Sequence, residues 1–180
     1  MNKILLIALL ILTIYSPLPV FAVSKKLDVP FVEQKKNYCG PASISMLFNY
    51  YDKNISQDEV AKHIYNPKIK GTLSIDLLLF VRNLDFYSEI YSSSIQDLKK
   101  KIDEGFPVIV MTKGDPNNSW SFFKNYHFFV IYGYDDKKNI FYCHSEDMKA
   151  SELPFKKLLG AWKETNCCAF IIYPRHEKKN

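Results

Sequence analysis

The chain has 180 residues, of which 47% are hydrophobic, and its 24 basic and 19 acidic side chains leave a formal net charge of +5. This excess is too small, and its lysines and arginines are too scattered, to indicate a nucleic-acid partner. No repeat or low-complexity linker divides the sequence, so we expect residues 23–180 to form one domain with a sizeable core.

Residues 1–22 have the pattern of a secretory signal peptide. Lys3 is followed by the unbroken apolar run 4–13, which is too short to span a membrane comfortably, and a small residue, Ala22, stands at the expected cut. We therefore expect an exported protein, periplasmic or extracellular, with no stable membrane insertion after cleavage. An uncleaved N-terminal anchor is the alternative.

The next segments bring a cysteine to the start of a helix. We expect an extended segment over 27–32, a polar loop over 33–38, and an apolar helix that begins at Cys39. The unpaired N–H groups and the positive dipole end of a helix N-terminus lower a thiol pKa and favour the thiolate. Gln34 lies close enough upstream for its side-chain amide to fold back over this helix start. Cys39 is therefore a candidate nucleophile.

The remaining pattern changes from helices to strands along the chain. A capping box of Ser56 and Glu59 begins a second helix that ends near Tyr65. Further helices are expected over 73–85, 94–104 and 154–162, and strands over 86–91, 107–112, 127–134, 140–144 and 167–173. Helices dominate the first half of the chain and strands the second, which is the order expected of an α+β fold.

A histidine supplies the second half of a thiol site. His127 opens the apolar strand 127–134, and a cysteine with a distant histidine is the sequence form of a thiol nucleophile and its general base. The backbone N–H of Cys39 and the amide of Gln34 are the expected oxyanion donors. The loop 113–125 directly precedes His127, so we expect it to border the cleft.

The group that orients His127 is sought on the neighbouring strand. The turn 135–139 joins the strands 127–134 and 140–144 into an antiparallel hairpin, and pairing Tyr134 with Asn139 sets position 146 opposite His127. His144, Glu146 and Asp147 all come within reach of the His127 ring in this register, and the sequence leaves the choice among them open.

The cysteines and histidines do not have the spacing of metal ligands. The four cysteines, Cys39, Cys143, Cys167 and Cys168, contain no Cys-x-x-Cys pair, and we predict neither a metal site nor a cofactor. In an oxidising compartment Cys143, Cys167 and Cys168 either form a disulfide or pack as buried thiols, and both readings stay open.

The order of these motifs resembles the papain-like cysteine peptidases, and specifically the bacterial peptidase C39-like family. The resembling segments are Gln34, the core 38–42, the segment 105–110, His127 with 133–135, and 155–162 before the last strand. The resemblance implies a papain-like cysteine peptidase fold, an N-terminal helical lobe followed by an antiparallel sheet lobe, and peptide-bond hydrolysis by Cys39, His127 and Gln34. The family's third residue, an Asp or Asn, falls on His144 or Ser145, and an imidazole there would orient the base but stabilise its charged form less than a carboxylate.

Three hypotheses about function follow. The first is a secreted or periplasmic cysteine peptidase that hydrolyses a peptide or protein substrate. The second, motivated by the departure at His144, is a catalytically impaired papain-fold binding module. The third is a thiol enzyme of the transpeptidase or phytochelatin-synthase-like type, which passes its acyl group to an acceptor other than water. Neither the substrate sequence nor the oligomeric state follows from the sequence.

Overall fold

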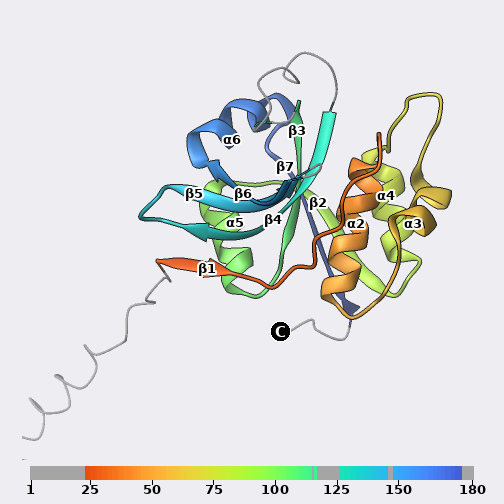
Figure 1. Ribbon diagram of the computed structural model, residues 1–180, viewed down its shortest axis with the longest axis horizontal. Coiled ribbons are helices and arrows are strands. Elements are labelled where there is room, and N and C mark those ends of the chain that lie inside the picture. The colour runs from red at the N-terminus through yellow and green to blue at the C-terminus, as the bar shows by residue number, and fades with distance from the viewer. Residues whose placement is uncertain (1–22, 115, 117–125, 146–147, 176–180) are drawn as a thin grey trace, which may run out of the picture.

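A computed structural model of the protein describes residues 23–114, 116, 126–145 and 148–175, and the predicted signal peptide 1–22 lies outside them. Three helices, α2 (Cys39–Tyr50), α3 (Gln57–Ile64) and α4 (Ser74–Arg82), gather on one side of a sheet, and α5 (Ile95–Asp103) and α6 (Phe155–Trp162) lie on the other (Figure 1). Within the described part of the chain, no helix is both long enough and apolar enough to cross a membrane.

The sheet is antiparallel throughout. Its strands are β1 (Ser24–Lys26), β2 (Phe86–Ser92), β3 (Val108–Lys113), β4 (Tyr126–Asp135), β5 (Ile140–Ser145), β6 (Met148–Pro154) and β7 (Cys168–Pro174). Their order is β2-β7-β3-β4-β5-β6, with β1 paired to β4 outside this path, and the short 3-10 helix η2 (Lys163–Thr165) leads from α6 towards β7. The predicted α+β fold, a helical lobe followed by an antiparallel sheet, is confirmed.

The strand β4 is buried on both faces. Phe128 and Val130 belong to the core cluster that α2, α3 and α4 form against the sheet. Phe129 and Ile131 belong to the second cluster, which includes Trp162 and other side chains of α5 and α6. Because side chains alternate along a strand, the unbroken apolar sequence of β4 supplies both clusters at once. Packing from both sides therefore fixes the position of this strand.

Two strands, β1 and β6, were not predicted from the sequence. The structure places β1 at 24–26, just before the extended segment expected at 27–32, and adds β6 after β5. β6 carries Lys149, Ala150 and Glu152, residue types that are depleted in strands, and Ala150 has a left-handed backbone with a φ of 57°. Neither β1 nor β6 shows the apolar run or the alternation of apolar and polar residues that predicts the other strands.

β1 completes the pairing of β4. β3 pairs with residues 126–131 of β4. β1 pairs with the same edge of β4 over residues 133–135, and Lys26 is the partner of Gly133. The two backbones approach so closely there that a Cβ atom on residue 133 would lie 2.7 Å from the carbonyl oxygen of Lys25. Glycine is the residue that this close approach requires.

We expect Gly133→Ala to destabilise the protein by about 1–3 kcal/mol, since the added methyl group must push β1 away from β4. Gly160→Ala is the matched control, because a Cβ at that position of α6 meets no heavy atom within 4 Å. Alanine in a helix should raise the free energy of unfolding by roughly 0.5–1 kcal/mol relative to glycine. Urea denaturation measures both changes, and equal midpoints for Gly133→Ala and the wild type would contradict this account of β1.

Candidate active site

Cys39 is the first residue of α2, and the helix behind it is buried from Gly40 to Phe48. Tyr38, which precedes the helix, makes no side-chain hydrogen bond to its first turn. The positive end of the helix dipole therefore acts on the half-buried Cys39 thiol without a competing side-chain cap. This is the local environment that the sequence predicts for a thiolate nucleophile.

The residues on both sides of Cys39 are packed against the segment that connects α3 to α4. The Tyr38 ring contacts the Tyr65 ring with a centroid separation of 5.1 Å. On the other side, a Cβ atom at Gly40 would lie 2.9 Å from Cβ and Oγ1 of Thr72. A side chain at position 40 would displace Thr72 or the helix start, so the Cys-Gly sequence is a packing requirement of this site.

β4 carries His127 at its beginning, next to Tyr126. The His127 side chain is buried, its Nε2 lies 2.9 Å from Oγ of Ser145, and its ring stacks on Phe129. The helix α2 packs against β4, and Figure 1 shows both elements beginning at the upper end of the molecule. The fold therefore brings the two sequence-predicted residues, Cys39 and His127, to the same end of the structure.

The predicted hairpin register is wrong. Tyr134 pairs with Phe141 and not with Asn139, and Val130 pairs with His144. Asp135 stays in the strand and accepts the backbone N–H of Lys138, while Asn139 closes the turn in a left-handed conformation with a φ of 56°. A bulge between Ile131 and Gly133 then shifts the pairing once more. Because a shift of one residue reverses the faces of a strand, Ser145 and not His144 lies on the side of His127.

Both ring nitrogens of His144 form hydrogen bonds with the backbone. Its Nδ1 accepts the backbone N–H of Ala150 at 3.1 Å, so Nε2 carries the proton and donates it to the carbonyl oxygen of Val29 at 3.0 Å. Its ring stacks on Tyr132, with centroids 4.3 Å apart. These contacts leave neither ring nitrogen for His127, so the geometry gives no support to His144 as the orienting residue. Glu146 and Asp147, the other candidates, and most of the loop 113–125 lie outside the described residues.

Burial lowers the pKa of His144 below its ordinary value of 6.5, and the nearby charge of Lys149 adds to this effect, whereas the bond to Val29 opposes it. The neutral ring that the two hydrogen bonds require is therefore also the form that burial favours. Through these bonds to Val29 and Ala150, His144 links the chain before α2 to the hairpin of β5 and β6.

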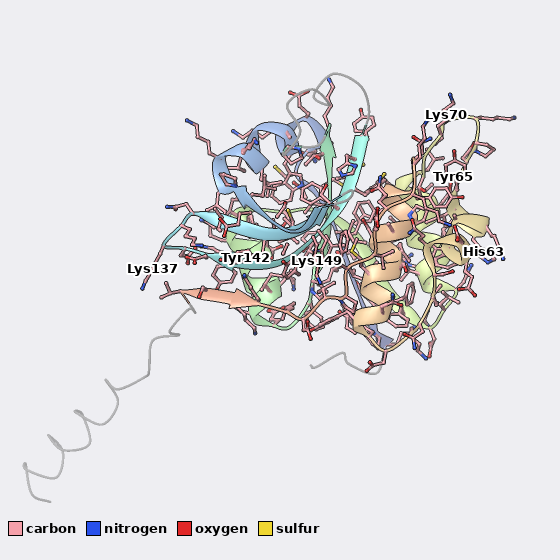
Figure 2. The ribbon with its side chains drawn as sticks, in the orientation of Figure 1. His63, Tyr65, Lys70, Lys137, Tyr142 and Lys149 are labelled. Carbon is pink, nitrogen blue, oxygen red and sulfur yellow. The ribbon has the colours of Figure 1, made fainter. Side chains whose placement is uncertain are left out.

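The pH dependence of unfolding tests this role. A folded-state pKa below the unfolded value means that the unfolded chain binds the proton first, so His144 contributes stability that is lost as the pH falls below 6.5. We expect the stability advantage of the wild type over His144→Gln to shrink between about pH 7.5 and about pH 5. His63→Gln is the control, because His63 lies exposed at the outer side of the helical layer (Figure 2). A constant difference across this range, measured by chemical denaturation, would refute the assignment.

Gln34 lies in an irregular segment that a residue of α3 holds in place. The side chain of Gln57 donates from Nε2 to the carbonyl oxygen of Glu33 at 2.7 Å and accepts the backbone N–H of Lys35 at Oε1 at 3.0 Å. Gln57 thus bonds to the residue on each side of Gln34. The neighbouring capping box of Ser56 and Glu59 forms as its sequence pattern predicts, whereas no sequence pattern indicates the role of Gln57.

The structure describes all four cysteines and joins none of them in a disulfide. Cys143 is buried beside Ser151, and burial raises the pKa of the Cys168 thiol. Of the two readings that the sequence left open for these residues, the structure shows packed thiols. Cys39 keeps the thiol that a nucleophile needs.

A family model and solved structures match this arrangement. The model of the Peptidase_C39 like family matches residues 26–170, so the chain belongs to this family of cysteine peptidases. Among the curated proteins, none matches the chain.

Three similar solved structures are distant from this chain in sequence. A double glycine motif protease from an AMS/PCAT transporter, solved with its leader peptide, is 21% identical with a TM-score of 0.64 and covers 83% of this chain and 94% of its own. A putative C39-like peptidase from Bacillus anthracis is 19% identical, with a TM-score of 0.65 and coverage of 84% and 98%. The peptidase domain of Streptococcus ComA is 17% identical, with a TM-score of 0.62 and the same coverage. These likenesses show a shared fold.

Proposed function

We propose that the protein is a cysteine peptidase that hydrolyses peptide bonds, with Cys39 as nucleophile, His127 as general base and Gln34 as an oxyanion donor. The observation that carries the proposal is the buried His127 ring, bonded at Nε2 to Ser145, on a strand that begins at the same end of the molecule as α2, whose first residue is Cys39 (Figure 1). The family and the fold support a peptidase function in general.

The hydrogen bond between His127 Nε2 and Ser145 leaves the other ring nitrogen of His127 able to accept a proton, as a general base must. With the Nε2 proton donated to the Ser145 hydroxyl oxygen, Nδ1 is free of a proton and takes the one that Cys39 loses. The sulfur then attacks the peptide carbonyl carbon, and the displaced electron pair forms an oxyanion that the Cys39 backbone N–H and the Gln34 amide stabilise. Collapse to a thioester expels the amine, which takes the proton from His127. Water, deprotonated by His127, then cleaves the thioester and releases the acid and the thiol.

Ser145 also bears on turnover. A serine hydroxyl orients an imidazole, but it carries no charge opposite the imidazolium that forms in each half-reaction. A serine bonded to His127, at one of the two positions where the family's Asp or Asn falls, is the observation that favours a second candidate function, a papain-fold binding module with impaired catalysis. We infer a peptide or protein ligand in both cases, and the leader peptide bound to the transporter protease supports this class of ligand.

The site of action is part of the proposal. We propose that residues 1–22 direct export and that the mature chain works in the periplasm or outside the cell, as the short apolar run after Lys3 indicates.

Alkylation measures the pairing of Cys39 with His127. Iodoacetamide should modify Cys39 well below the ordinary thiol pKa of about 8.5, and His127→Ala should slow this reaction by about tenfold or more, since the thiolate loses its partner. Mass mapping separates Cys39 from Cys143, Cys167 and Cys168, which serve as internal controls. Equal alkylation rates in the two proteins at each pH would rule out the proposed pair.

Substitution of Ser145 tests the orienting role. Ser145→Ala should lower kcat by about 10-fold to 100-fold, less than the roughly 10⁴-fold loss when a charged orienting aspartate is replaced, because the hydroxyl orients the imidazole but carries no charge. Ser145→Asp should raise kcat, because a carboxylate stabilises the imidazolium. Ser151→Ala, on the adjacent strand β6, is the matched control and should keep the wild-type kcat. An unchanged kcat in Ser145→Ala would remove Ser145 from the site.

A further inference from the structure

The segment that carries Gln34 has no regular structure to place it. Residues 31–35 lie in no helix or strand, and a turn follows them in which Tyr38 donates its backbone N–H to the carbonyl oxygen of Lys35. An oxyanion donor acts only when its N–H group is held at about 2.7–3.1 Å from the developing charge. The placement of the Gln34 side chain must therefore come from the contacts of its neighbours.

We propose that Gln57 is a positioning residue that fixes Gln34 for its role in the oxyanion hole. This inference rests on the proposed function. One side-chain amide bonds to the backbone on both sides of Gln34, through Glu33 and Lys35, so it fixes both the location and the orientation of the intervening residue. Gln57 is only 8% exposed, which excludes water from competition for these bonds.

The helix α3, which carries Gln57, is itself held firmly in place. Gln57 is the first residue of α3, where Ser56 and Glu59 form a complete capping box. The helix is then anchored in the core by Val60 and Ile64. A second link, the ion pair between Lys35 and Asp58, joins side chains that are 58% and 53% exposed, so it contributes little. Phe31 and Val32 pack against the core before Gln34, and Gln57 adds the bonds to the two residues directly next to it.

Glutamine is the residue type that this geometry demands. Its amide is a donor and an acceptor at once, and both functions are used. A glutamate of the same shape still accepts the Lys35 N–H, but its carboxylate cannot donate to the Glu33 carbonyl and would face that oxygen with a negative charge. Gln57→Glu therefore removes the hydrogen bond to the Glu33 carbonyl oxygen without changing the volume of the side chain.

The matched control is Gln96→Glu. Gln96 lies exposed in the first turn of α5, which Ser94 caps as Ser56 caps α3. Both substitutions place a carboxylate near a helix N-terminus, where the dipole favours negative charge, so both proteins should fold. They differ because Gln57 bonds to the residues on both sides of Gln34, whereas Gln96 is an exposed residue of α5.

The kinetic test separates positioning from a general structural effect. We expect Gln57→Glu to lower kcat for a peptide substrate by about tenfold or more with little change in KM, because the oxyanion develops only in the transition state. Alkylation of Cys39 by iodoacetamide forms no oxyanion and should keep its wild-type rate. In a Gln34→Ala background the same substitution should have little further effect on kcat, since the two residues act as one unit.

A second measurement needs no turnover. In ¹⁵N-labelled protein, the side-chain amide signal of Gln34 should shift or broaden in Gln57→Glu and keep its position in Gln96→Glu. An unchanged Gln34 signal, or a kcat in Gln57→Glu equal to that of Gln96→Glu, would overturn the inference. A wild-type protein that cleaves no peptide would instead overturn the proposed peptidase function, while the NMR comparison still decides whether Gln57 positions Gln34.

Discussion

The burial of β4 on both faces is the constraint on which the rest of the structure depends. One face of the strand meets the helices α2, α3 and α4, and the other meets α5 and α6. β3, β5 and β1 occupy its edges. A strand held from four sides has one position, and so does the histidine at its beginning. The apolar packing of β4 therefore determines where His127, the proposed general base, lies.

One bulge and one turn set the β4–β5 register, and this register determines which residue contacts His127. The bulge lies at Tyr132, whose carbonyl oxygen accepts the backbone N–H of Leu27, so the chain that leads out of β1 takes part in setting the register. With this register, a serine hydroxyl lies against His127 and a histidine is buried on the opposite face. The N-terminal chain thus supports the site twice, through its contact with Tyr132 and through the carbonyl oxygen of Val29, which accepts a hydrogen bond from His144.

The sequence predicts those parts of the site that have a local signal. Cys39 stands at the start of an apolar helix and His127 at the start of an apolar strand, and both patterns are visible within about ten residues. The partner of His127 is different, since the hairpin register depends on the left-handed conformation of Asn139, which the sequence does not reveal. Gln57 is hidden for another reason: its partners lie 22 and 24 residues away, and a glutamine in a first helical turn is usually exposed. The export signal in residues 1–22 stays a prediction.

The most direct test of the central claim is to trap the acyl-enzyme. A peptide mixture is reacted briefly with the mature protein and quenched in acid, which preserves thioesters, and the modified cysteine is located by mass spectrometry. The account predicts an acyl adduct on Cys39, absent from Cys143, Cys167 and Cys168 and lost in Cys39→Ser. Folded protein that yields no adduct, or an adduct on one of the other three cysteines in place of Cys39, would contradict it.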